Sequence, residues 1–467
     1  MSKKLRYLFC TLLVFVTSLP AGFSQIGKRF PSEKRIVKDS VTGAELTFLT
    51  STPKGDHKIY QTHPQWTADG KWLIFRSNRI PNEAIAVNEQ TGDLVQVSEG
   101  GKRKGMLCIA QKSMKLYFMQ NAGDNPSKAT EQSGTGQANN SSAKEIIEVD
   151  LARVFADSEA RKLKRGSAYQ RVCGTIPAEM RADDLALDSE EEWLYFKVGN
   201  SEAAKYLAQG TKISDNFGPR NMGAGPTGLV RMNVRSGELK HIVSVPFQIG
   251  HIQTNPWKTG EIIFCWETGG KSPQRTWVVN ADGTGLRPLY PEADYEWVTH
   301  EAVITADEVA IAIMGHRPVP GIQNTGVNAP ATPVSGANPG QESGWGPSGT
   351  REKPTGLGIV NLRTREMTIA GQTPSGSGLW HVHGSPDGRW AVGDDFSRSV
   401  YLIDRHTGEM ITLTAGHKTT ASDHPHPTFS RDGTRIQIQS AMLSEDGKSM
   451  NICIVPVPEA WLKRSHK

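Results

Sequence analysis

The chain is poor in cysteine, and what cysteine it has is scattered. Only five of 467 residues are cysteine, and one of them, Cys10, lies in an apolar run near the N-terminus. The other four form no Cys-x-x-Cys pair, so a zinc site of that kind is not indicated. Two lie in apolar runs typical of strands, which favours buried side chains over disulfides. The four are Cys108, Cys173, Cys265 and Cys453.

A strong charge of either sign is also missing. The chain has 53 basic and 48 acidic residues, and without the three basic residues at its N-terminus 50 face 48. Such a balance gives no case for nucleic-acid binding. There is no Gly-x-Ser-x-Gly motif and no phosphate-binding glycine-rich motif. A serine peptidase fronted by a propeller and a nucleotide-binding protein are therefore not supported.

The first 24 residues have the pattern of a secretory signal peptide. Lys3, Lys4 and Arg6 precede an apolar run from Tyr7, and small residues follow it. The run is short for a membrane span. We therefore expect a cleaved leader at residues 1–24 and a periplasmic or secreted mature protein without a membrane span. Residues 25–467 are expected to form one domain, and the sequence leaves its oligomeric state open.

A short pattern recurs seven times along the chain. It consists of a turn, often with Asp-Gly, followed by an apolar strand, and a second strand–turn–strand pattern follows most copies. Two strands joined by such a turn form a hairpin, so each unit supplies about four strands, as in a propeller blade. The copies lie at residues 67–75, 111–118, 188–196, 258–264, 305–311, 385–392 and 430–436.

These repeats predict an all-β fold, a seven-bladed β-propeller with four-stranded blades. The last repeat provides only about three strands, and residues 41–49 read as one more strand before the first blade. We expect this N-terminal strand to close the ring by pairing in the last blade. The low-complexity segments 121–143 and 318–353, and with them 201–226, are expected to be loops on one face.

Histidine is the residue that carries candidate chemistry. Several of the 13 histidines precede the inner strand of a blade. His424 and His426 are separated by a single residue in an extended segment, so their side chains project to the same face. They are a natural pair of metal ligands. Taken alone, this pair and His300 are equally compatible with ordinary hydrogen-bonding histidines.

The sequence resembles the oligogalacturonate lyase family almost from end to end. No single motif is specific, but their order along the chain is that of the family. The matching segments are 42–47, 57–60, 249–251, 262–267, 275–277, 280–284, 299–301, His381 with 387–388, 392–394, 424–429 and 455–461.

The resemblance implies a seven-bladed propeller with a divalent metal, usually manganese, in a central funnel. It implies β-elimination on short pectin-derived uronides, an acidic oligosaccharide substrate. The implied metal ligands are His300, His424 and His426, and the implied base is His251. His57, Lys58, Tyr60, Arg275 and His381 would line the funnel.

Two positions depart from the family pattern. Ala421 stands where the family has a glutamine ligand, and Gly228 where it has an assisting arginine. Asp423 or water could complete the metal site, and Arg220 or Arg275 could supply the positive charge. We expect the base to face the metal, with Arg275 nearby and without a carboxylate that would hold it protonated. A binding propeller with structural histidines, or a metal-dependent enzyme for another acidic sugar, are the alternatives.

Overall fold

The computed structural model describes residues 25–123, 142–216, 222–268, 272–293, 296–316, 354–373 and 378–465. The predicted leader 1–24, the predicted loop 318–353 and most of the loop 121–143 lie outside the described residues. Among the described residues, no helix is long and apolar enough to cross a membrane.

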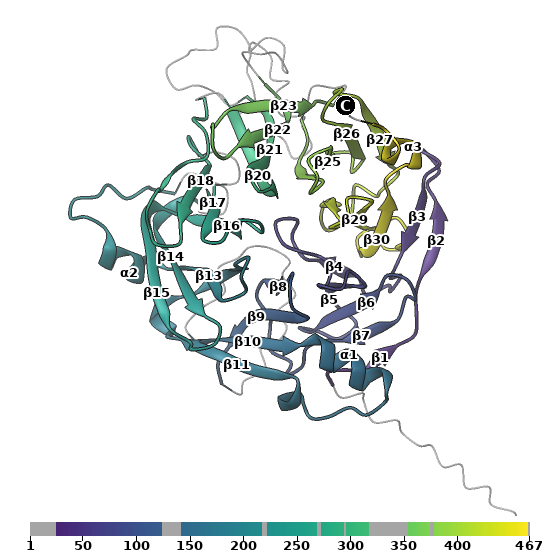
Figure 1. The fold of residues 1–467 in the computed structure, drawn as a ribbon, viewed down its shortest axis with the longest axis horizontal. Coiled ribbons are helices and arrows are strands. Elements are labelled where there is room, and N and C mark those ends of the chain that lie inside the picture. The colour runs from purple at the N-terminus through teal and green to yellow at the C-terminus, as the bar shows by residue number, and fades with distance from the viewer. Residues whose placement is uncertain are drawn as a thin grey trace, which may run out of the picture.

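Seven antiparallel sheets form a ring around a central axis (Figure 1), which confirms the predicted seven-bladed β-propeller. We number the blades 1 to 7 along the chain and give their strands from the axis outward. Blade 1 has β4 (Asp56–Lys58), β5 (Trp72–Ser77), β6 (Ala84–Asn88) and β7 (Leu94–Gln96), with β1 (Arg29–Phe30) outside them; blade 2 has β8 (Leu107–Ile109), β9 (Lys115–Asn121), β10 (Lys144–Asp150) and β11 (Gln170–Ile176); blade 3 has β12 (Asp183–Leu187), β13 (Trp193–Val198), β14 (Ala224–Asn233) and β15 (Leu239–Phe247).

The remaining blades follow in the same order. Blade 4 has β16 (Ile249–Thr254), β17 (Glu261–Trp266), β18 (Thr276–Asn280) and β19 (Arg287–Pro288); blade 5 has β20 (Glu296–Thr305), β21 (Glu308–His316), β22 (Gly356–Asn361) and β23 (Met367–Gly371); blade 6 has β24 (His381–Gly384), β25 (Trp390–Asp394), β26 (Val400–Asp404) and β27 (Met410–Thr414); blade 7 has β28 (Thr428–Phe429), β29 (Arg435–Ser440) and β30 (Asn451–Pro456).

The sheet of blade 7 also contains strands from the N-terminal part of the chain. In it β3 (Glu45–Phe48) pairs antiparallel with β30, Thr47 opposite Ile454 and Phe48 opposite Cys453, and β2 (Arg35–Lys38) lies outside β3. Leu46 and Phe48 are fully buried between this sheet and blade 6. Segments about 400 residues apart in sequence are therefore neighbours in one sheet.

The recurring turn has the same local chemistry in three blades. Asp69, Asp387 and Asp432 each accept a hydrogen bond of 2.6 Å from the hydroxyl group two residues earlier. The glycine that follows has a positive φ, 68° at Gly70, which non-glycine residues rarely adopt. This is why Asp-Gly recurs at the start of the second strand of a blade.

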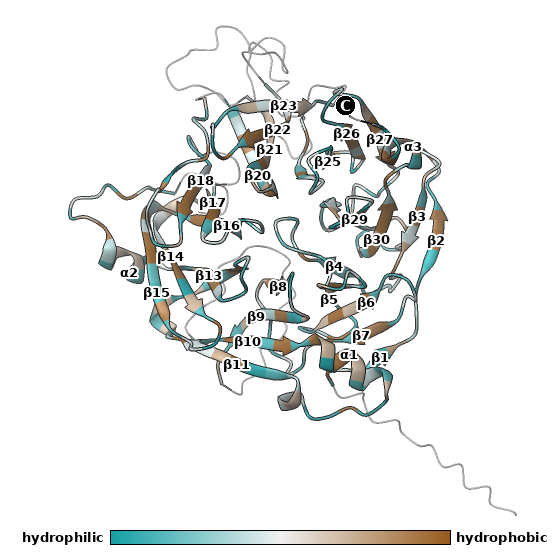
Figure 2. Cartoon of the chain, viewed as in Figure 1, coloured by the Kyte–Doolittle hydropathy of each residue, from teal (hydrophilic) through white to brown (hydrophobic). Residues whose placement is uncertain are grey.

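Apolar residues fill the spaces between neighbouring blades. The described residues form seven hydrophobic clusters, and each is shared by two adjacent blades. Hydrophobic residues lie mainly on the strands and hydrophilic ones mainly on the connecting loops (Figure 2). The four cysteines Cys108, Cys173, Cys265 and Cys453 are free and buried, as predicted.

Few helices are present among the described residues. They are α1 (Leu151–Glu159), α2 (Asn200–Ala203), α3 (Glu459–Leu462) and the 3-10 turns η1 (Gly166–Ala168), η2 (Ala178–Met180) and η3 (Ala204–Tyr206). In α1, the side chain of Asp150 accepts from the backbone N–H of Arg153 and caps the helix. Phe155 of α1 stacks on Trp72 of blade 1 at 4.2 Å between ring centres.

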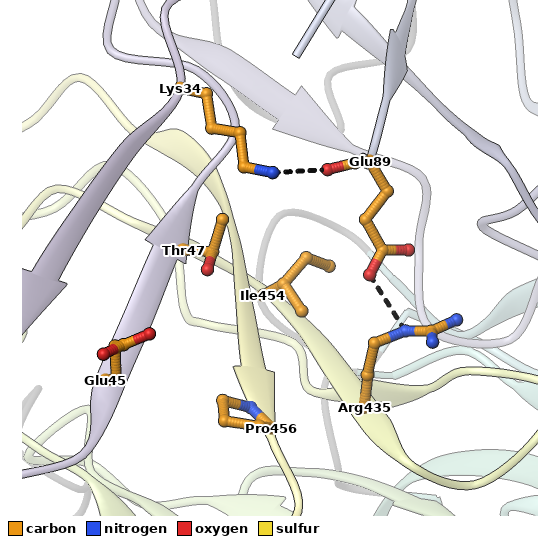
Figure 3. Close-up of a pocket in the computed structure, with 7 residues that line it drawn as sticks. All are labelled: Lys34, Glu45, Thr47, Glu89, Arg435, Ile454 and Pro456. Atoms are coloured by element: carbon orange, nitrogen blue, oxygen red, sulfur yellow. Dashed lines mark hydrogen bonds and ion pairs between the residues drawn. The ribbon is translucent and has the colours of Figure 1, made fainter. Parts of the chain in front are cut away.

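A pocket of about 240 Å³ lies where blade 7 meets blade 1, away from the axis (Figure 3). Three of its charged groups have protein partners: Lys34 Nζ donates to the carbonyl oxygen of Glu89 at 3.0 Å, and Arg435 Nε lies 2.9 Å from Glu89 Oε1. No predicted site residue lines it. This pocket is therefore not the predicted site, which is expected at the axis of the propeller.

Candidate functional site

The inner strands carry most of the residues that the sequence singled out. His57 and Lys58 lie on β4, His251 on β16, His300 on β20 and His381 on β24. The others adjoin strands of the same blades: Tyr60 follows β4, Arg275 directly precedes β18, and His424 and His426 precede β28. Blades 1, 4, 5, 6 and 7 therefore contribute to one site, and blades 2 and 3 supply none of the predicted residues.

Backbone irregularities direct two of these histidines. The pairing register shifts between Gly250 and Gln253 in β16 and between Thr299 and Glu301 in β20. At these bulges His251 has φ 49° and His300 has φ 35°, and His426 has φ 51° in its loop. Left-handed backbone at a non-glycine residue is costly and clusters at functional sites, and bulges turn side chains out of the regular alternation.

His381 lies at the centre of the histidine cluster. Its ring centre is 3.6 Å from that of His426, 4.3 Å from His300 and 5.2 Å from His424. The Tyr60 ring lies against the same group, 5.2 Å from His426 and 6.4 Å from His300. The predicted ligands and the predicted funnel residues His381 and Tyr60 thus form one continuous cluster.

One ring nitrogen of this cluster lacks a protein hydrogen-bond partner. His300 Nδ1 is buried without one. His426 Nε2 is also buried and has Asp423 Oδ1 beside it at 3.0 Å. Burial holds the pKa values of His300 and His381 well below the ordinary range, so both rings are neutral. Neutral imidazoles with free nitrogens are the form that binds a divalent metal.

The groups of ligand atoms that lie close together differ from the predicted set. In the part of the chain that the structure describes, two groups of three ligand atoms lie within 4.8 Å of one another: His381 with Asp394 and His424, and His251 with Cys265 and Glu267. His300, His424 and His426 do not form such a group among these residues. Their assignment as a ligand set stays a prediction.

Asp394 joins two of the histidines. This fully buried carboxylate lies 3.2 Å from His381 Nδ1 and 2.8 Å from His424 Nδ1, and it accepts the backbone N–H of His381 at 2.9 Å. A carboxylate on Nδ1 holds the proton there and leaves Nε2 with its lone pair. Asp394 therefore orients both rings with Nε2 available to a ligand.

His251 has carboxylates on both ring nitrogens. Its Nδ1 lies 3.0 Å from Glu301 Oε1, and its Nε2 lies 3.3 Å from Glu267 Oε2. Burial alone would lower the pKa of His251, but Glu301 and then Glu267 outweigh it and raise this pKa above its ordinary value. The expectation of a base without a carboxylate partner is wrong, because the bulges bring β20 and the end of β17 against the ring.

The guanidinium of Arg275 lies beside the Nδ1 side of the His251 ring. Its side chain is 2% exposed; Nε donates to Glu301 Oε2 at 3.1 Å, and Nη2 is 3.3 Å from His251 Nδ1. The carboxylates and the guanidinium form a buried network around the imidazole. Arg275 thus lies next to His251, and its Nε is already bound to Glu301.

Lys58 and His57 lie at the seam between blades 1 and 7. Lys58 is 5% exposed, and its ammonium donates to Thr428 Oγ1 at 2.9 Å and to the carbonyl oxygen of Ile59. Burial lowers the pKa of Lys58 to about 7 and also lowers the pKa of His57. Lys58 therefore has a structural partner in blade 7, and its contact with substrate stays a prediction, as does that of His57.

The position of Gly228 is crowded for any side chain. A Cβ there would lie 3.0 Å from Ser244 Oγ and 3.2 Å from Val198 Cγ2. Arg220 lies outside the described residues. Blade 3 therefore gives the site no arginine at Gly228.

The sequence interpretation missed the carboxylates that orient the histidines: Glu267, Glu301 and Asp394. All three lie in segments that resemble the lyase family, 262–267, 299–301 and 392–394, so a signal was present. Their role was not visible because it depends on which blades face each other across the axis.

The fold and the site define a seven-bladed propeller with a histidine cluster at its axis. Two solved structures share this fold. One, an oligogalacturonate lyase in complex with manganese, has 18% sequence identity and a TM-score of 0.65, with 94% of this chain and 100% of that chain covered. The other, an oligogalacturonate lyase from Vibrio parahaemolyticus, has 18% identity and a TM-score of 0.66, with 93% and 100% covered.

At this identity the likeness shows the shared fold. No family model matches the chain, and no curated protein matches it. The fold expected from the sequence resemblance is therefore confirmed, and the activity has to be argued from the site.

Proposed function

We propose that this protein is a lyase that cleaves short uronic-acid oligosaccharides of the oligogalacturonate type by β-elimination. The observation that carries the proposal is the pairing of two features at the axis: a cluster of histidines that includes the neutral His300 with a free buried Nδ1, and a second histidine, His251, set between two carboxylates. The likeness to two oligogalacturonate lyases over nearly the whole chain supports it.

The reaction needs a base and a means to spread negative charge. The base takes the proton from C5, which lies next to the C6 carboxylate; the electrons form the C4–C5 double bond, and the C4–O bond breaks. The proton is finally returned to the leaving oxygen, so no water is consumed. The product is a 4,5-unsaturated uronate, and no pair of hydrolytic carboxylates is required.

His251 is the base in this proposal. Glu301 holds the proton on Nδ1, so loss of the other proton leaves the lone pair on Nε2 to accept the proton from C5. Arg275, bound to Glu301, keeps this carboxylate charged and fixed. Because Glu267 lies beside Nε2, the base is free only above the raised pKa of His251.

The histidine cluster suits a divalent metal. His300, His424 and His426 would hold it, with His381 and Asp423 beside them. The half-exposed carboxylate of Asp423 could serve as the further ligand that Ala421 cannot supply. Bound there, a divalent cation such as manganese would act as a Lewis acid on the substrate carboxylate. Asp394 orients two of these rings, those of His381 and His424.

We also propose that the protein works outside the cytoplasm, after removal of residues 1–24. The N-terminal charge and apolar pattern support export. A periplasmic or secreted lyase would meet acidic oligosaccharides released from polymers.

The proposal is tested by incubating the metal-loaded protein with digalacturonate and trigalacturonate and following ultraviolet absorbance of an unsaturated product. The variants His251→Ala and His251→Gln should lower turnover about a hundredfold or more, with metal content unchanged. Binding without product would favour a binding propeller. Product from another acidic sugar alone, in a panel of uronides, would change the substrate but keep the chemistry.

A further inference from the structure

The turn between β25 and β26 lies on the same end of blade 6 as the histidine cluster. His381 begins β24 and pairs with Asp394, which ends β25, so the following residues 395–399 continue from the level of His381. Asp394 binds His381 and His424 directly. The turn therefore stands at the rim of the candidate site, although no expected site residue lies in it.

This turn is held in one shape by Asp395. Its Oδ1 accepts the backbone N–H of Ser399 at 2.9 Å and the hydroxyl of Ser397 at 2.7 Å, and its Oδ2 accepts the hydroxyl of Tyr401 at 3.1 Å. Arg398 donates its backbone N–H to the carbonyl oxygen of Asp395 and has φ 69°. The left-handed backbone is unfavourable for arginine, yet the turn fixes it there.

The Arg398 guanidinium has donors without acceptors. Its Nε and Nη1 are buried and have no hydrogen-bond partner, and within the described ranges no carboxylate lies within ion-pair distance of it. Burial lowers the pKa of Arg398, and the more distant Asp394 and Asp423 oppose this shift. A buried N–H without an acceptor is unfavourable, so a charged group held this way indicates an acceptor that the protein itself does not supply.

Two aromatic side chains lie beside the turn. Phe396 belongs to it, and its ring centre is 5.2 Å from that of Trp380, which lies 4.6 Å from His300 and 5.8 Å from His424. Both rings are partly exposed. Aromatic rings offer a flat apolar surface to a sugar, and an arginine fork matches the geometry of a carboxylate.

We propose that Arg398 binds a carboxylate of the uronide, with Phe396 and Trp380 contacting its sugar ring. This inference rests on the proposed function and names the residue that recognises the substrate's charge. It agrees with the rest of the site, since position 228 is a glycine in crowded surroundings and Arg275 is bound to Glu301.

The experiment compares Arg398→Gln and Arg398→Lys with the wild-type protein on trigalacturonate, with metal content and thermal unfolding as further readouts. Arg365→Gln is the matched control, because Arg365 also lies in a blade turn, has φ 64° and has a buried Nε without a partner, but lies between β22 and β23. Arg398→Gln should raise KM about tenfold to a hundredfold, with unchanged metal content. Arg398→Lys should recover part of the loss, because it restores the charge but not the fork.

A second arm uses the methyl ester of trigalacturonate as a competitor. The ester should compete more weakly than the acid for the wild-type protein. In Arg398→Gln the difference between acid and ester should be smaller, because the acid has already lost its contact with the arginine. The inference is overturned if Arg398→Gln and Arg365→Gln have the same KM. It is also overturned if the only defect of Arg398→Gln is a loss of metal or of folding stability, and Arg398→Lys shows the same loss. If the wild-type protein acts on no uronide, the proposed function itself fails, and the variants are not needed to see it.

Discussion

At the scale of single residues, the site is built from histidines whose state is set by buried carboxylates. Asp394 holds the Nδ1 protons of His381 and His424, and Glu301 holds that of His251. His300 has no such partner at Nδ1 and is kept neutral by burial. The same residue type therefore serves two purposes: neutral rings suited to a metal, and one ring with a raised pKa.

The raised pKa of His251 predicts the pH dependence of activity. A base must be unprotonated, so activity should rise with pH through this pKa, and the acid limb of kcat/KM should lie above the ordinary histidine value of about 6.5. Glu267→Gln removes one carboxylate, lowers the pKa of His251 and should move the limb to lower pH.

Glu261→Gln is the control for this experiment. Glu261 lies on the same strand, β17, is 4% exposed and pairs with Arg363 at the other end of the blade. It should leave the limb in place. A limb that does not move in Glu267→Gln would mean that His251 is not the group whose ionisation limits the reaction.

Asp394→Asn tests the orientation of the metal-binding rings. An amide can no longer accept both Nδ1–H groups, so metal affinity, measured by titration calorimetry with Mn²⁺, should fall about tenfold to a hundredfold. Asp404→Asn, another fully buried acid of blade 6 that pairs with Arg464, controls for loss of stability. Equal affinity in Asp394→Asn and the wild-type protein would remove Asp394 from the site.

At the scale of elements, the repeats predicted the blades because turn chemistry and strand alternation are local. The Asp-Gly turns at Gly70, Gly388 and Gly433 mark the starts of second strands in sequence as well as in structure. The histidine positions followed from these starts. The bulges at His251 and His300 were not predictable, because a bulge depends on pairing with a neighbouring strand rather than on local pattern.

Asp39 ties the segment after β2 to the outermost strand of blade 6. Its Oδ2 accepts the Thr414 hydroxyl at 2.6 Å and the Ala415 N–H at 2.7 Å, and its Oδ1 accepts the Val41 N–H. Burial alone would raise the pKa of Asp39, but the hydrogen bond from Thr414 and the backbone donors lower it to about 2. Because this pKa is depressed, the stabilisation is present above the unfolded value and is lost as the pH falls towards about 2.

Asp39→Asn should therefore lose about 2 kcal/mol of unfolding free energy at about pH 5, and the difference from the wild-type protein should shrink at about pH 2.5. Urea denaturation at the two pH values measures it. Asp69→Asn, at an exposed turn residue, is the control and should show no such pH-dependent difference. A pH-independent deficit in Asp39→Asn would indicate that the carboxylate charge does not contribute.

At the scale of the whole molecule, the ring brings to one axis residues that are far apart in the sequence. The site combines side chains from five blades, and no blade contains it alone. The sequence identified the histidines because each lies on or just before an inner strand. The facing carboxylates depend on how the blades are arranged around the axis. The integrity of the ring is therefore a condition for the site.

Phe48→Ala tests whether the strand from the N-terminal part of the chain supports that ring. Phe48 is fully buried between blades 6 and 7 and pairs with Cys453, so its loss leaves a cavity at the seam and should cost about 3–5 kcal/mol. Phe30→Ala, on the outer strand β1 with a partly exposed ring, should cost much less. Because His424 and His426 belong to blade 7, we expect metal binding by Phe48→Ala to be lost at a lower urea concentration than in Phe30→Ala. Equal urea midpoints for unfolding and metal release in the two variants would show that blade 7 and its histidines do not depend on β3.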